Sequence, residues 1–150
     1  MIVKSLDHLN QISKTISQKL GNGDCIFLIG EIGVGKTTLT RYLINNLQNQ
    51  KGLKETEVLS PTFNLLYEYE IKDLKIMHYD LYRITKDNEI DHLGIFSENE
   101  KTVKIIEWPD LIKTPLSNKL EIHLEYVEND NEREIKIYGS DKWRVLVNEI

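Results

Sequence analysis

Glycine, lysine and threonine stand together in this chain at the spacing of a phosphate-binding loop. The stretch GEIGVGKT, which begins at Gly30, matches the pattern G-x-x-x-x-G-K-[ST] in full. Gly30 and Gly35 permit a tight backbone path that turns N–H groups inward, and Gly33 keeps a further side chain away from the phosphates. Lys36 can reach the β- and γ-phosphates of a nucleotide, and the Thr37 hydroxyl can bind magnesium. The pattern predicts a socket for nucleotide phosphates.

Phosphoryl transfer also needs a held metal ion, a positioned nucleophile and control of water, and three residues elsewhere can supply these. Asp80 ends the apolar stretch LKIMHYD and can be a second anchor for magnesium. Glu107 ends TVKIIE and can hold the metal through water or orient an attacking water. Thr62, in SPTF, can meet the γ-phosphate side of the metal. Each residue also has a structural interpretation, as a strand-end aspartate, a strand-end glutamate paired with a lysine, or a capping hydroxyl.

Other polar and aromatic residues near these positions give weaker signals. His78 and Tyr79 precede Asp80, so at most one of them shares its face of a strand. For His78 a structural role is favoured over metal binding, because the histidines show no metal-ligand spacing. Trp108 can cover the site or cap the strand. Arg83 can pair with Asp80, contact phosphate or face a partner.

The hydrophobic pattern predicts the elements that position these residues. The spacing of apolar residues from Leu6 to Leu20 predicts a helix over residues 5–20, with Ser5 as N-cap and Gly21 as its stop. Two further helices are expected, over residues 36–50 and 86–95. Strands are expected over 25–30, 74–80 and 102–107, with one or two more within 58–71, and residues 118–127 and 133–139 are expected to form a hairpin. The tail from residue 142 is expected to be a strand or a last helical turn. These elements predict an α/β fold: a single-domain P-loop NTPase with a mostly parallel sheet, flanking helices and antiparallel edge strands.

Composition favours one soluble domain that spans residues 1–150. Forty per cent of residues are hydrophobic and 29% are charged. The single cysteine, Cys25, lies in the apolar run CIFLI, which predicts a buried thiol and is too short to span a membrane. With no signal peptide pattern at the N-terminus, we expect a cytoplasmic protein. The net charge of −5 and the lack of a basic stretch predict that any RNA is held by another subunit.

The motifs GEIGVGKTTLTR, SPTF, HYDLYR, EIDHLGI and IEWP occur in this order. Over roughly residues 1 to 140, the chain resembles the TsaE (YjeE) family of bacterial ATPases for tRNA threonylcarbamoyladenosine biosynthesis. The resemblance implies binding of ATP or ADP with Mg²⁺. It also implies TsaB- and TsaD-like partner proteins, which modify the adenosine at position 37 of tRNA. The family member would contact tRNA indirectly, and its ATP hydrolysis would reset the assembly between rounds.

The resemblance also implies roles for individual residues. Thr37 and Glu107 would be magnesium positions, Asp80 the acid needed for hydrolysis, and Thr62 a switch-like threonine. Arg133, in the expected hairpin, would reach the nucleotide, although the motif there is loose. The nucleotide-binding set would comprise Gly33, Val34, Gly35, Lys36, Thr37, Thr38 and Arg133.

Three other functions also use a phosphate-binding loop. A small-molecule kinase needs a second substrate pocket and usually an arginine-rich lid, whereas the four arginines here are dispersed: Arg41, Arg83, Arg133 and Arg144. A nucleotide-dependent binding switch would have negligible turnover. A GTPase is not favoured, because no N-K-x-D motif follows the loop.

Overall fold

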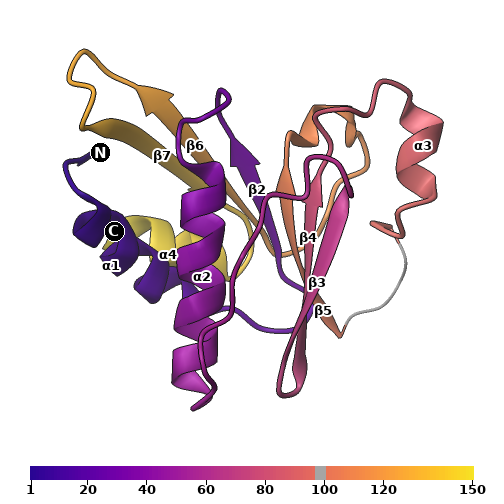
Figure 1. Cartoon of the computed structure of the whole chain (residues 1–150), viewed down its shortest axis with the longest axis horizontal. Helices are drawn as coiled ribbons and strands as arrows, with labels where there is room; N and C mark the ends of the chain where they lie inside the picture. Colours follow the sequence, from indigo (N-terminus) through magenta and orange to yellow (C-terminus); the bar gives the residue numbers. More distant parts are fainter. Residues whose placement is uncertain (97–100) are drawn as a thin grey trace.

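The computed structural model describes residues 1–96 and 101–150, which form one seven-stranded sheet with helices on both faces (Figure 1). The strands are β1 (Ile2–Val3), β2 (Cys25–Ile29), β3 (Leu66–Ile71), β4 (Leu74–Asp80), β5 (Thr102–Glu107), β6 (Lys119–Tyr126) and β7 (Arg133–Gly139). The helices are α1 (Leu6–Ser17), α2 (Lys36–Gln50), α3 (Asp87–Asp91) and α4 (Trp143–Glu149), with a 3₁₀ turn at Pro109–Leu111.

The sheet has a parallel centre and antiparallel edges, in the order β1-β7-β6-β2-β5-β4-β3. Strand β2 pairs in parallel with both β5 and β6, and β4 pairs in parallel with β5. At one edge β3 runs antiparallel to β4, and at the other β7 runs antiparallel to β6 and to β1. The predicted α/β class, with its parallel centre and antiparallel edge strands, is confirmed.

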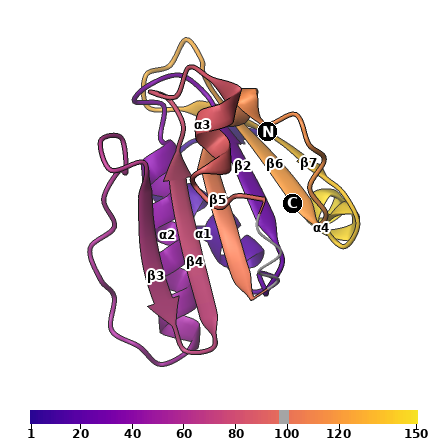
Figure 2. The same ribbon diagram turned by 90° about the vertical axis from the view of Figure 1, so that its right-hand side faces the viewer.

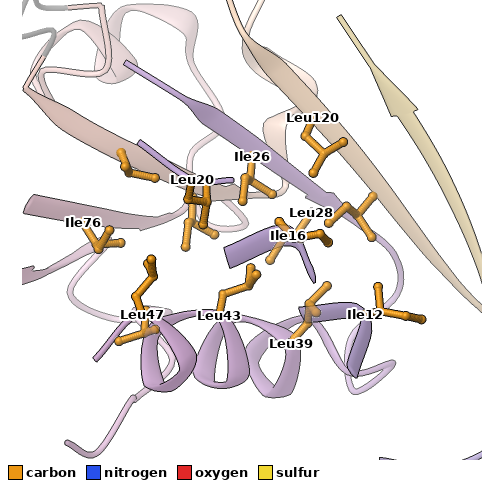
Figure 3. Packing of buried hydrophobic residues seen from close by; sticks show 14 of the residues in the cluster. Ile12, Ile16, Leu20, Ile26, Leu28, Leu39, Leu43, Leu47, Ile76 and Leu120 are labelled. Carbon is orange, nitrogen blue, oxygen red and sulfur yellow. The ribbon is translucent and has the colours of Figure 1, made fainter. Parts of the chain in front are cut away.

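One face of the sheet is covered by α1 and α2, which pack on the apolar side chains of the central strands (Figure 3). Leu39, Leu43 and Leu47 recur every four residues along α2, so they form one buried stripe. Ile26 and Leu28 of β2 meet this stripe. Each such side chain contributes about 1.5–3 kcal/mol on burial, and together they fix the start of α2 against the end of β2.

The opposite face carries a second apolar cluster beneath α3, which lies in front of the sheet in Figure 2, whereas α1 and α2 lie behind it. Phe27, Tyr79 and Ile106 point to this side, and Ile90 of α3 packs with them. Side chains alternate along a strand, so His78 and Asp80 point to the α1–α2 side, where the phosphate loop lies.

The structure corrects the prediction in four places. Helix α1 ends at Ser17 rather than at Leu20, and Leu6 is 62% exposed although the periodicity assigned it to the buried face, because it lies in the first turn, beside a surface hollow. Helix α3 ends at Asp91 rather than near Gly94. Of the one or two strands expected in residues 58–71, the structure has one, β3, after a loop, which agrees with the prediction. The N-terminal strand β1 was not predicted, because a strand of two residues is too short to show the alternation of apolar and polar side chains.

The C-terminal tail is a helix. Trp143 of α4 is buried and its Nε1 donates to the carbonyl of Asn118 at 2.9 Å, so a long-range contact selects the helix. Among the residues that the structure describes, no helix has both the length and the apolar character needed to cross a membrane.

Candidate functional site

Strands β2, β4 and β5 end at the same edge of the sheet, and a cleft of about 250 Å³ opens there. Ligands of open α/β sheets bind at the carboxyl ends of parallel strands. The register places Asp80 directly beside Glu107. The cleft is lined by Ile32, Gly33, Gly35, Lys36, Thr37, Thr38, Ser60, Thr62, Asp80, Tyr82, Glu107 and Trp108. The structure thus brings together most of the predicted site residues; Val34 and Arg133 lie in a neighbouring hollow instead.

The phosphate loop connects β2 to α2, and its glycines meet specific steric needs. Gly33 and Gly35 have φ angles of 78° and 125°, a region that side chains with a Cβ rarely adopt. At Gly30 the need is space, because a Cβ would lie 2.6 Å from the carbonyl oxygen of Leu124. The loop therefore passes close to β6 and turns sharply into the helix.

Lys36 is the first residue of α2, and its ammonium group lies inside the cleft. The Nζ donates hydrogen bonds to the carbonyls of Gly30 and Glu31, the second at 3.0 Å, and lies 4.1 Å from the centroid of the Trp108 ring. Burial lowers the pKa of Lys36, although Glu107 and other nearby carboxylates oppose this shift. A phosphate in the cleft would restore a counter-charge to this ammonium group.

Both carboxylate oxygens of Asp80 accept hydrogen bonds from within the protein. Its Oδ1 accepts from the backbone N–H of Tyr82 at 2.9 Å, and its Oδ2 accepts from the Thr62 hydroxyl at 3.1 Å. The Ser60 hydroxyl lies 2.7 Å from that of Thr62. The loop that contains SPTF is therefore linked to the strand-end acid. The sequence did not predict this contact, because Thr62 and Asp80 are 18 residues apart.

Glu107 is buried and lies 2.7 Å from His78, measured from Oε2 to Nε2. Sequence reasoning assigned His78 a structural role and missed this contact. The signal was its position two residues before Asp80, which places both side chains on the same face of β4. Within the described part of the chain, the Nδ1 of His78 has no hydrogen-bond partner.

The oxygen atoms in the cleft fit a magnesium ion. Thr37 offers a hydroxyl, and Asp80 and Glu107 offer carboxylates, which are the hard donors that Mg²⁺ prefers. In residues 1–96 and 101–150 no group of three His, Cys, Asp or Glu side chains could form a complete metal cage. Magnesium usually binds through one or two carboxylates together with the substrate's phosphates, so this sparse set suits a metal that arrives with a nucleotide.

A second hollow lies on the other side of the phosphate loop, and both Arg133 and the first turn of α1 line it. Arg133 donates from Nε to the carbonyl of Val34 at 3.0 Å. Ser5, Leu6 and Thr38 also line this hollow, together with other residues of α1 and the β6–β7 hairpin. The contribution of α1 was missed by sequence reasoning, which read that helix only as a packing element.

The mouth of the cleft carries exposed apolar side chains. Ile32, which lines the cleft, is 65% exposed, and Phe63, the residue after the lining Thr62, is 80% exposed. The Arg83 guanidinium lies 5.3 Å from the centroid of the Phe63 ring, so it pairs with this aromatic residue. Trp108 packs on Tyr82 with ring centroids 4.8 Å apart, which places it at the cleft rather than only at the strand end.

Comparison with known proteins decides the family. The family model described as threonylcarbamoyl adenosine biosynthesis protein TsaE matches residues 3–135. This chain belongs to the TsaE family. The matched range contains the phosphate loop, Asp80, Glu107 and the β6–β7 hairpin as far as Ile135, so the TsaE family pattern covers the whole candidate site.

Relatives named as the tRNA threonylcarbamoyladenosine biosynthesis protein TsaE align over most of their length. The protein from Rickettsia felis is 34% identical over 131 residues, 87% of this chain and 74% of the relative. The protein from Aquifex aeolicus is 31% identical over 138 residues, 92% of this chain and 94% of the relative.

A solved structure agrees with the TsaE fold. The crystal structure of Bacillus subtilis YdiB superposes with a TM-score of 0.71 at 26% sequence identity. The match covers 99% of this chain and 90% of that chain. The small strand β1 and the C-terminal helix α4 thus fall within the range of the structural match.

Proposed function

We propose that this chain binds ATP with Mg²⁺ and hydrolyses it, slowly or in response to partners, in support of tRNA threonylcarbamoyladenosine modification. One observation carries the proposal: Lys36, Thr37, Asp80 and Glu107 come from three separate elements and converge on one cleft. Membership of the TsaE family supports the pathway. We propose that the protein works in the cytoplasm, where tRNA is modified.

The phosphate loop would hold the β- and γ-phosphates of ATP. The N-terminus of α2 presents unpaired N–H groups and the positive end of its dipole to an anion. The Lys36 ammonium, which lies in the same cleft, adds a charge-assisted contact. Gly33 and Gly35 allow the backbone to approach the phosphates closely, because neither carries a side chain.

Thr37 and Glu107 would hold the magnesium ion, which neutralises charge on the phosphates when it is bound. The carboxylate of Asp80 would orient the attacking water or the metal's hydration shell from the end of β4. Its two hydrogen bonds, from Thr62 and from the N–H of Tyr82, keep that carboxylate in one orientation. Preorganised groups of this kind lower the barrier because they need not reorient during the reaction.

The second hollow would receive the nucleoside. It adjoins the phosphate cleft through Gly33, Gly35 and Thr38, which line both. Its apolar wall, formed in part by Leu6 and Leu9, suits the face of a base. Arg133 lies in the same hollow and would face the nucleotide there.

TsaB- and TsaD-like proteins would dock on the apolar mouth of the cleft. Ile32, Phe63 and Tyr82 are exposed there, and the Arg83 guanidinium lies over the Phe63 ring. Aromatic and arginine side chains are enriched where protein–protein binding energy is concentrated. The net charge of −5 makes the chain a poor independent tRNA binder, so tRNA would be held by these partners.

A hydrolysis assay tests the proposal against a kinase and against a switch without turnover. ATP consumption is measured for the chain alone, with TsaB- and TsaD-like proteins, and with tRNA added. We expect slow hydrolysis that rises with the partners and is lost in Asp80→Asn and in Glu107→Gln. A phosphorylated small-molecule acceptor would indicate a kinase. Nucleotide-dependent partner binding that persists in both variants, with no phosphate release from the wild type, would indicate a switch.

A further inference from the structure

Two side chains of the β6–β7 hairpin donate hydrogen bonds to the backbone of the phosphate loop. The Tyr126 hydroxyl donates to the carbonyl of Ile32 at 3.0 Å, and the Arg133 Nε donates to the carbonyl of Val34 at 3.0 Å. Tyr126 ends β6 and is paired in register with Arg133, the first residue of β7. The guanidinium lies 4.5 Å from the centroid of the tyrosine ring. The hairpin therefore holds the loop at two alternate residues.

These contacts determine where the next N–H groups point. In a planar trans peptide the C=O of one residue and the N–H of the following residue face opposite ways. Holding the Ile32 carbonyl against the hairpin therefore directs the Gly33 N–H away from it, and holding the Val34 carbonyl does the same for Gly35. Both glycines line the phosphate cleft. Because glycine has wide conformational freedom, such contacts restrict its orientation more than they would that of another residue.

We propose that Tyr126 is a positioning residue for phosphate binding, acting through the loop rather than by contact with the nucleotide. This inference rests on the proposed nucleotide-binding function. A carbonyl turned toward a phosphate would repel it, whereas an N–H group attracts it, so the hydroxyl on the Ile32 carbonyl keeps the loop in its binding orientation. Gly33 makes room for this contact, since a Cβ there would lie 3.2 Å from the tyrosine oxygen.

The test removes one hydroxyl and keeps the ring. Tyr126→Phe loses the bond to Ile32 but retains the stack with Arg133, and Tyr138→Phe is the matched control on β7, where the ring contacts His123 instead of the loop. Affinity for Mg·ATP and for inorganic tripolyphosphate is measured by calorimetry. We expect Tyr126→Phe to bind both about 2- to 10-fold more weakly, and Tyr138→Phe to match the wild type.

The amide NMR signal of Gly33 gives a second readout without nucleotide, and it should move in Tyr126→Phe and stay in place in Tyr138→Phe. Wild-type affinity in Tyr126→Phe, with or without a lower unfolding midpoint, would overturn the inference. A loss of affinity in Tyr126→Phe for ATP but not for tripolyphosphate would also overturn the inference, because Tyr126 would then act on the nucleoside. If the wild type binds neither ligand, the proposed function fails, and the inference fails with it.

Discussion

The imidazole Nε2 of His78 lies 2.7 Å from the Oε2 of Glu107, and both side chains are shielded from water. A carboxylate can only accept a hydrogen bond, so this contact requires the ring proton of His78 on Nε2 whenever Glu107 carries its charge. This hydrogen bond holds one oxygen of Glu107 against His78 on the α1–α2 side of the sheet, next to the cleft that Glu107 lines.

Removal of this partner should destabilise the fold. His78→Leu leaves a buried carboxylate without its hydrogen bond, so we expect a loss of roughly 3 kcal/mol in the free energy of unfolding. His78→Gln, whose amide can still donate, should lose less. Urea denaturation measures both, with the exposed His92→Leu as a control expected within about 0.5 kcal/mol of wild type. An unchanged midpoint for His78→Leu would show that the contact does not stabilise the protein.

The Thr37 hydroxyl should matter most when magnesium is present. In Thr37→Ala we expect ATP affinity to fall about tenfold with Mg²⁺, as for loss of a contact to a charged group. In EDTA the loss should be much smaller. Calorimetric titrations under the two conditions compare the variant with itself, so a general folding defect would lower both affinities. Equal losses would remove the metal role from Thr37.

The exposed Phe63 should contribute to partner docking and not to nucleotide binding. Phe63→Ser should weaken binding to a TsaB–TsaD-like complex at least tenfold, as expected for an aromatic side chain buried at an interface. ATP affinity should not change, because Phe63 does not line the phosphate cleft. Val145→Ser, at a similarly exposed position on helix α4, is the control. Biolayer interferometry that finds equal partner affinity for the two variants would place the docking surface elsewhere.

The buried thiol of Cys25 should be inert in the folded protein. Burial raises the pKa of Cys25 from 9.0 to about 12, so almost no reactive thiolate is present at pH 8. The folded pKa is raised, so its stabilising contribution is complete below pH 9 and is lost as the pH rises toward 12. The unfolding free energy of the wild type should therefore fall faster than that of Cys25→Ala between pH 8 and 10. Fast labelling by a thiol reagent at pH 8 would contradict this burial.

Local signals explain which parts of the fold could be predicted. The apolar run of β2, the glycine pattern and the leucine stripe of α2 each lie within a few neighbouring residues. Their elements were therefore predicted with correct or nearly correct ends. The carboxyl ends of β4 and β5 could be predicted to hold Asp80 and Glu107, since parallel strands end at a common edge.

Long-range contacts explain the rest. Tyr126 and Ile32 are 94 residues apart, and His78 and Glu107 are 29 residues apart, so no local pattern joins them. The same holds for α4, whose helical form depends on the contact of Trp143 with Asn118. The exposed Leu6 satisfied the helical period but lies in a first turn that extends beyond the core.

Lys36 gives the most direct test of the central claim that this loop binds nucleotide phosphates. Mg·ATP is titrated calorimetrically into the wild type and into Lys36→Ala, with thermal unfolding to show that the variant is folded. We expect saturable binding to the wild type and affinity at least tenfold weaker in the variant, because a charge-assisted contact to phosphate is lost. Absence of binding to the wild type at millimolar ATP, or equal affinity in the two proteins, would contradict it.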